Sequence, residues 1–155
     1  MLATAIAVLG TLLGTVVAGA FQQKSASRAA TAAATEQLRR ERLAAVTELA
    51  AAAADHQLAM WMRGEAQFSG ATPERVEELR SIAHATRSAI TRPLVAVQVL
   101  IPDPTVRAAA HDMVAATYWM RDADTSTEAL VAAQTEARAS HDRFVDAAAA
   151  YLTTA

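Results

Sequence analysis

Residues 68–74 read FSGATPE, and this stretch decides the fold. Its Ser-Gly-Ala breaks the helical pattern, so the preceding helix is expected to end near Phe68. Thr72 then offers a side-chain oxygen as an N-cap, and Pro73 suits the first helical position. Glu74 places a carboxylate in the first turn, where the helix dipole favours negative charge. The stretch therefore predicts two consecutive helices joined by a short turn.

Apolar residues recur at three- and four-residue steps on both sides of this turn. A second turn, IPDP at residues 101–104, places Asp103 as the cap of a third helix, and the polar run 124–127 supplies caps for a fourth. Pro93 lacks a backbone donor, so a kink at Pro93 or a short break near Thr91 is expected. Helices are expected at about 43–68, 73–101, 104–121 and 127–152. Because the connections are short, neighbouring helices should be antiparallel, which predicts a four-helix bundle over residues 43–155.

The composition supports an all-α fold and excludes several classes of function. Alanine supplies 41 of the 155 residues, which favours helix, and five glycines with four prolines are too few for a many-stranded fold. Fourteen basic against 16 acidic side chains give a net charge of −2, so no direct binding of nucleic acid is expected. The absence of cysteine excludes disulfides, thiolate metal sites and thiol catalysis.

The first 21 residues carry no charged side chain. As a helix they would reach about 31 Å, which matches a hydrocarbon core of about 30 Å, so residues 1–21 are predicted to form a single transmembrane helix in the cell membrane. Lys24 and Arg28 form a positive flank directly after it, which places the N-terminus outside and the C-terminal bundle in the cytoplasm. Two alternatives are a signal peptide cleaved near residues 18–20 and a helix buried in a protein core.

Small residues recur every four positions in this segment, at Gly10, Gly14 and Ala18. In lipid this spacing lets two helix backbones approach closely, so the three residues are a candidate face for self-association. The alternative is a chance spacing, since glycine is common in membrane helices. Residues 22–42 are expected to continue the helix as a thin juxtamembrane stalk that leads into the bundle.

Four histidines, His56, His84, His111 and His141, fall one on each predicted helix of the bundle. Such an arrangement invites comparison with metal and haem sites, but none of them follows a glutamate by three residues, as in the di-iron bundles. Ordinary surface or boundary histidines are therefore expected, with a metal site and a buried pH-sensitive pair as the alternatives. The sequence contains no recognisable catalytic triad or phosphate loop, so no catalytic residue, metal or cofactor is predicted.

Two further features concern the bundle. Trp61 is expected near the membrane-distal end of the first bundle helix and Trp119 near that of the third, so both indoles should share one layer. Arg80, Arg87 and Arg92 on the second helix are candidates for a strip that attracts anions. A solvated charged face is the alternative for these arginines.

Four stretches without a chemical signature carry a resemblance to a known family: VLGTLLG at 8–14 ahead of Gln22-Gln23, ADH at 54–56 ahead of Met60-Trp61, HATRSAI at 84–90 ahead of Pro93-Leu94, and DRFVDAA at 142–148. They resemble the KilB-like, or plasmid spread, proteins of streptomycetes and related actinomycetes. The resemblance covers nearly the whole chain. It implies a membrane-associated protein that assists the spread of conjugative plasmids through the mycelium and is toxic when unregulated, and it implies no enzymatic activity.

Together these expectations predict a non-enzymatic, membrane-anchored, self-associating protein whose cytoplasmic bundle docks other components and assists plasmid spread. The expected partners are membrane lipid, a second copy of the chain, and plasmid-transfer or other membrane proteins. Two alternatives remain open. One is a membrane-lesion protein of the holin type, whose oligomers perturb the bilayer, and the other is a sensor, enzyme or metal-binding bundle that uses the histidines.

Overall fold

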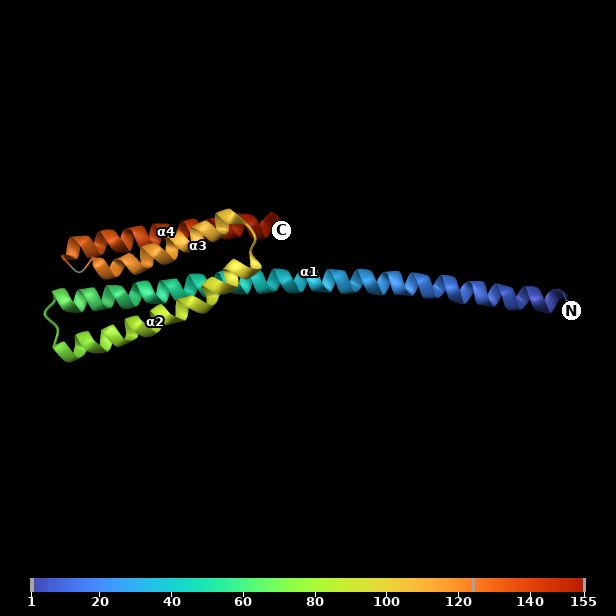
Figure 1. Ribbon diagram of the computed structural model, residues 1–155, viewed down its shortest axis with the longest axis horizontal. Coiled ribbons are helices and arrows are strands. Elements are labelled where there is room, and N and C mark those ends of the chain that lie inside the picture. Colours follow the sequence, from blue (N-terminus) through green and yellow to red (C-terminus); the bar gives the residue numbers. More distant parts are fainter. Residues whose placement is uncertain (1, 124, 155) are drawn as a thin grey trace. The chain divides into compact units, whose positions relative to one another are not determined.

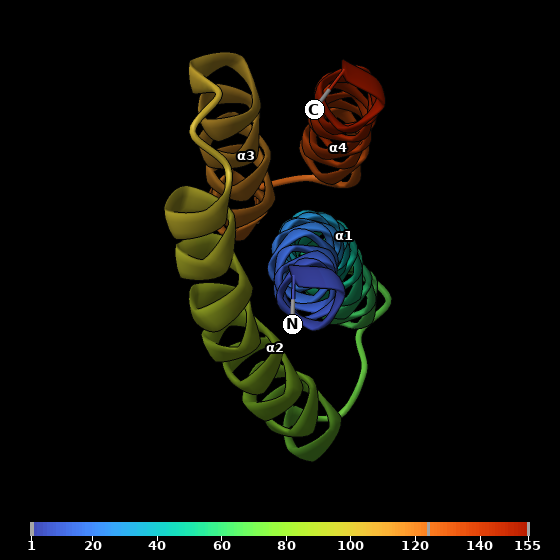
Figure 2. The same cartoon turned by 90° about the vertical axis from the view of Figure 1, so that its right-hand side faces the viewer.

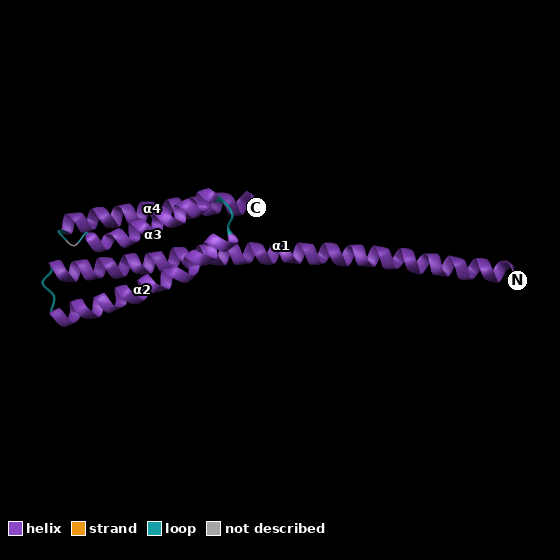
Figure 3. Ribbon diagram, viewed as in Figure 1, coloured by secondary structure: helices purple, strands orange, loops and turns teal. Residues whose placement is uncertain are grey.

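The computed structural model describes the backbone of residues 2–123 and 125–154 and, except at 2–23 and 25, their side chains. Helices account for nearly all of this part of the chain (Figures 1 and 3). They are α1 at Leu2–Phe68, α2 at Pro73–Leu100, α3 at Pro104–Trp119, the 3₁₀ turn η1 at Met120–Asp122, and α4 at Thr127–Thr154. The prediction of an all-α chain with four helices is confirmed for the described residues, which contain no strand.

The chain divides into two units, residues 1–38 and residues 39–155. We call the second of these the bundle unit. It contains the C-terminal part of α1 together with α2, α3 and α4, and α3 and α4 lie side by side in both views (Figures 1 and 2). The predicted division into 1–21, 22–42 and 43–155 stays a prediction.

Local capping explains where α2 begins. The hydroxyl oxygen of Thr72 accepts the backbone N–H of Arg75 at 3.4 Å, Pro73 occupies the first turn, and Gly70 adopts a φ of +73°, which favours glycine. Hydrogen bonds from its own backbone N–H and from Thr72 lower the pKa of the Glu74 carboxyl. The predicted start of the second helix is therefore confirmed.

The starts of α3 and α4 are also capped by side chains. Oδ1 of Asp103 accepts the N–H groups of Thr105 and Val106 at 2.8 and 3.0 Å, as its position in the turn predicts. At α4 the hydroxyl of Ser126 accepts the N–H of Ala129 at 3.1 Å. Position 124, which the sequence also offers as a cap, lies outside the described residues.

The helix α2 runs through Pro93 without the short break that proline allows. Pro93 is buried, and α2 curves along its length where it passes from α1 towards α3 (Figure 2). A proline in a helix removes one backbone hydrogen bond, and burial of its ring against the neighbouring helix offsets part of that cost.

Two clusters of apolar side chains form the core of the bundle unit. The first, which centres on the fully buried Phe144, contains Ala45, Val46, Leu49, Ala53, Ile90, Val97, Ile101, Val106, Ala110, Met113, Val114, Phe144 and Ala148. The second contains Ala59, Met60, Ala83, Met120, Leu130 and Ala137. All four helices contribute to the core, and the many alanines let their backbones approach closely.

One part of the sequence interpretation has to be corrected. Within the part of the chain whose side chains are described, no helix combines the length and the apolar character that crossing a membrane requires. The predicted location, a single-pass protein of the cell membrane with its N-terminus outside and its bundle in the cytoplasm, is contradicted by this finding. The helix α1 is continuous, but charged side chains at Lys24, Arg28 and within residues 36–42 prevent a long apolar stretch in this part of it. The side chains of residues 1–21, on which the prediction rested, lie outside the described set.

Candidate functional site

The most elaborate polar arrangement of the bundle unit surrounds His56 on α1, which is only 3% exposed. Its Nδ1 lies 3.0 Å from the hydroxyl oxygen of Thr86 on α2, and its ring meets the ring of Tyr118 on α3 edge to face at 5.7 Å. The single hydroxyl proton of Thr86 is donated back to the carbonyl of Ile82 or Ala83, both at 3.1 Å. Nδ1 of a neutral His56 therefore donates to Thr86, which fixes the tautomer.

Burial, followed by electrostatic effects of Arg87 and His84, lowers the pKa of His56 from 6.5 to about 4. His56 is therefore uncharged near neutral pH. Its contacts with Thr86 and Tyr118 link α1 to α2 and α3. His84 is exposed, as expected of a surface histidine, so the alternative of a buried pair of His56 and His84 is not formed; His56 itself is buried.

Tyr118 also contacts a cationic side chain, that of Arg87. The guanidinium of Arg87 lies 4.3 Å from the centre of the Tyr118 ring, close enough for a cation–π interaction. A series of contacts thus leads from the core to the surface, from His56 to Tyr118 and from Tyr118 to Arg87. Each contact restricts the position of the next side chain.

These three residues line one side of a small hollow between α1, α2 and the end of α3. We call it the cationic hollow. Its lining residues are His56, Met60, Arg63, Arg80, Ala83, His84, Arg87, Tyr118 and Arg121. Four of these are arginines, and none of the described residues that line it is acidic. Two of the arginines have exposed carboxylate neighbours to one side, Glu77 at 2.8 Å from Arg80 and Asp122 at 3.0 Å from Arg121.

A second hollow, of about 350 Å³, adjoins the cationic hollow, and we call it the indole hollow. Arg87, Tyr118 and Arg121 line both, and the indole hollow adds Trp119, whose side chain is 69% exposed. The exposed indole of Trp119 offers an open aromatic face on which a flat group could stack.

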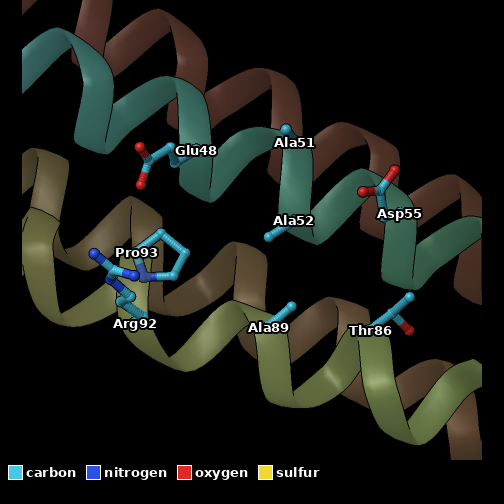
Figure 4. A pocket seen from close by; sticks show the side chains of 8 residues that line it. All are labelled: Glu48, Ala51, Ala52, Asp55, Thr86, Ala89, Arg92 and Pro93. Carbon is cyan, nitrogen blue, oxygen red and sulfur yellow. The ribbon is translucent and has the colours of Figure 1, made fainter.

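A groove of about 420 Å³ lies elsewhere, between α1 and α2 (Figure 4). Glu48 and Asp55 of α1 lie on one side of it and Arg92 and Pro93 of α2 on the other, and its floor is made of alanines. The two carboxylates are seven residues apart on one helix, about 10 Å, which is too far to share a proton or a metal ion. Among the described residues no three potential metal ligands are grouped together.

The other sequence-derived candidates are not brought together by the structure. Trp61 packs on the second core cluster and lines a hollow with Phe68 and Leu130, whereas Trp119 lines the indole hollow. That the two indoles share one layer of the bundle stays a prediction. His111 contacts the side chain of Gln98 at 2.8 Å near the surface. Lys24 and Arg28 are exposed on α1, and the side chains at Gly10, Gly14 and Ala18 lie outside the described set.

Sequence reasoning missed the roles of Thr86 and Tyr118. The available signal was a threonine within the apolar stripe of α2, where a hydroxyl can donate to a carbonyl of its own helix and still accept a hydrogen bond from another helix. Of the predicted arginine strip, Arg80 and Arg87 line the cationic hollow, whereas Arg92 lines the groove between α1 and α2.

The fold and this site define an all-helical bundle protein whose buried histidine joins helices. Residues 43–152 match the family described as KilB plasmid transfer protein. The chain is also 47% identical over 102 residues to Protein KilB of Streptomyces lividans, an alignment that covers 66% of this chain and 67% of that protein. No solved structure matches the chain. The chain therefore belongs to the KilB family, as the resemblance of its four stretches predicts.

Proposed function

We propose that this protein assists plasmid spread without catalysing a reaction, through contacts that its bundle unit makes with a second copy of the chain and with other plasmid-transfer proteins. The observation that carries the proposal is the place of the family match. It covers residues 43–152, which fall within the bundle unit, so the part related to plasmid transfer is the packed helical part.

The chemistry of the buried histidine supports a structural role. A general base near neutral pH needs a pKa near 7 and access to a substrate proton. His56 has a pKa of about 4, is 3% exposed and already donates to Thr86. Its properties therefore suit helix packing better than proton transfer.

Exposed apolar side chains on α1 support association with another protein chain. Leu58 is 58% exposed and Met62 is 38% exposed, and four-residue spacing places them on the same face of α1. Pairing two such faces would remove both side chains from water in each copy, which favours association. Gly10, Gly14 and Ala18 remain a second proposed face for self-association.

Plasmid spread in a recipient mycelium lacking the gene tests the role. Complementation with the wild-type chain should restore spread, and His56→Gln should restore it to a similar extent if no proton transfer is involved. Loss of spread in a His56→Gln protein that is folded and present at wild-type amounts would contradict the non-enzymatic part of the proposal.

Crosslinking in cells tests self-association and separates the two faces. Leu58→Glu with Met62→Glu should reduce crosslinked dimers several-fold if the bundle face is used, with the exposed Gln67→Glu as the control because residue 67 lies on the opposite side of α1 from residue 58. Gly10→Leu with Gly14→Leu tests the other face, with Gly19→Leu as its control because residue 19 lies on the opposite side of a helix from residue 10. Dimer yields unchanged in both double variants would refute self-association through either face.

A further inference from the structure

The cationic hollow concentrates positive charge from three elements. Arg63 comes from α1, Arg80 and Arg87 come from α2, and Arg121 comes from η1. Guanidinium groups that converge in this way repel one another, and a bound anion converts this repulsion into attraction. Glu77 and Asp122 form exposed ion pairs with Arg80 and Arg121, and such pairs contribute little free energy. None of the described residues that line the cationic hollow carries a carboxylate.

One of the four arginines is held in position. The guanidinium of Arg87 lies 4.3 Å from the centre of the Tyr118 ring, which in turn packs against the buried His56. Stacking on a ring leaves the in-plane N–H groups of a guanidinium available, and their fork geometry matches two oxygens of a phosphate. Burial is the main cause of the lowered pKa of His56, and the charge of Arg87 adds to it, as expected beside a hollow with a positive potential.

The hollow itself has room for part of a phosphate group and no more, since its volume is about 30 Å³. The rest of a bound molecule has to extend outward. The indole hollow next to it, of about 350 Å³, shares Arg87, Tyr118 and Arg121 with the cationic hollow and adds Ala115, Asp122 and the exposed ring of Trp119. The carboxylate of Asp122 is paired with Arg121 at 3.0 Å. A flat heteroaromatic base is the group that best uses an exposed indole, because stacking on an aromatic side chain contributes about 1–3 kcal/mol per base.

We propose that the bundle unit binds a nucleoside di- or triphosphate, with its phosphates beside Arg63, Arg80, Arg87 and Arg121 at the mouth of the cationic hollow and its base against Trp119 in the indole hollow. The ligand is a free nucleotide. A net charge of −2 for the chain and four arginines in one small hollow do not provide the extended basic track that a nucleic-acid strand requires.

Binding of ADP to the purified full-length chain, measured by calorimetry and by tryptophan fluorescence, tests the proposal. A Trp61→Phe background leaves Trp119 as the single tryptophan, which is excited selectively at wavelengths that tyrosine does not absorb. ADP should bind saturably and quench the fluorescence. Pyrophosphate should bind at least threefold more weakly without quenching, since it lacks the base.

Variants assign the two halves of the site. Arg87→Gln and, separately, Arg63→Gln should weaken ADP and pyrophosphate binding about tenfold each, and Arg92→Gln is the matched control because Arg92 lies on α2 but lines the other groove. Trp119→Leu should reduce the affinity for ADP to that for pyrophosphate and leave pyrophosphate binding unchanged. Circular dichroism confirms that each variant is folded, and Arg63→Gln keeps the test decisive if Arg87→Gln does not fold.

Three results would overturn the proposal. The first is no saturable binding of ADP or ATP up to millimolar concentration. The second is ADP binding that Trp119→Leu and both arginine variants leave intact. The third is binding of a short single-stranded oligonucleotide by a chain that does not bind ADP, which would make the surface a nucleic-acid site instead.

Discussion

The side-chain amide of Gln57 on α1 donates a hydrogen bond to the hydroxyl oxygen of Thr117 on α3, over 3.2 Å and out of reach of water. The same amide lies 3.3 Å from the backbone carbonyl of Ala137 on α4, and Thr117 donates its own proton to the carbonyl of Met113 at 2.8 Å. A buried polar group is satisfied in only a few arrangements of its neighbours. This network therefore fixes the relative register of α1, α3 and α4 in an alanine-rich core whose apolar contacts alone specify register weakly.

Thr117→Val should destabilise the bundle unit by about 1–3 kcal/mol. Valine has nearly the same shape as threonine, but it removes the acceptor for Gln57 and leaves a buried donor with one partner fewer. Chemical denaturation monitored by circular dichroism measures the change in the free energy of unfolding. An unchanged midpoint would show that the amide finds another acceptor.

The double variant Thr117→Val with Gln57→Met is the control for this prediction. It replaces both polar partners by apolar groups of similar size, so no buried donor is left without an acceptor. Its stability should recover to within about 1 kcal/mol of the wild type. Additive losses in the two single variants and the double variant would argue that the hydrogen bond does not couple the two residues.

The buried His56 makes stability depend on pH below neutrality. Its pKa is lowered from 6.5 to about 4 on folding, so the unfolded chain binds a proton that the folded chain does not. The stabilisation is complete above pH 6.5 and is lost as the pH falls from 6.5 towards 4. At 1.36 kcal/mol per pKa unit the loss over this window is about 3 kcal/mol.

Denaturation at pH 7 and at pH 4.5 compares the wild type with His56→Gln, which cannot titrate. The variant should lose less stability between the two pH values, and the difference isolates His56 from the carboxylates that titrate in both proteins. His111→Gln is the matched control, because His111 is exposed and its removal should leave the wild-type pH dependence in place. Equal slopes in the wild type and His56→Gln would contradict the assigned pKa.

The turns of the fold could be predicted because their information is local. Thr72 with Pro73 and Asp103 with Pro104 each place a cap and a first helical residue within two positions of sequence, and the observed helices begin there. The sequence alone does not determine whether α2 breaks or only bends at Pro93, because this depends on the burial of the proline ring.

The site could not be predicted because it depends on contacts between distant residues. His56 and Thr86 are 30 positions apart, and only the register of α1 against α2 decides which side chain faces the imidazole. Metal-binding spacing concerns the distances of the histidines from one another in sequence. The observed partners of His56 are instead Thr86, Tyr118 and nearby charged groups.

Gly70→Ala should lower the free energy of unfolding by about 1 kcal/mol. Gly70 has a φ of +73°, a region in which a side chain meets its own backbone, while no atom outside the turn lies within 4 Å of the place for a Cβ. The cost is therefore conformational and not a clash with the core. Gly70→Asn is the control and should cost less than alanine, because asparagine tolerates this region better. A larger loss for asparagine than for alanine would contradict the conformational explanation.

Arg42 on α1 should contribute about 1–2 kcal/mol to the stability of the bundle unit by closing the end of α2. Its Nε donates to the carbonyl of Leu100, the last residue of α2, at 2.9 Å, and its guanidinium lies 5.5 Å from the centre of the Tyr151 ring of α4. The last carbonyls of a helix lack partners within it, and a cation beside them also opposes the negative end of the helix dipole. One side chain thus joins three helices.

Arg42→Met keeps much of the apolar stem but removes the donor and the charge, so it should show the full loss in chemical denaturation. Arg42→Lys keeps the charge without the directed Nε–H and should recover part of the stability. The exposed Arg138→Met on α4 is the matched control and should change the unfolding free energy by less than about 0.5 kcal/mol. If Arg42→Met and Arg138→Met cost the same, the contact with Leu100 does not hold the end of α2.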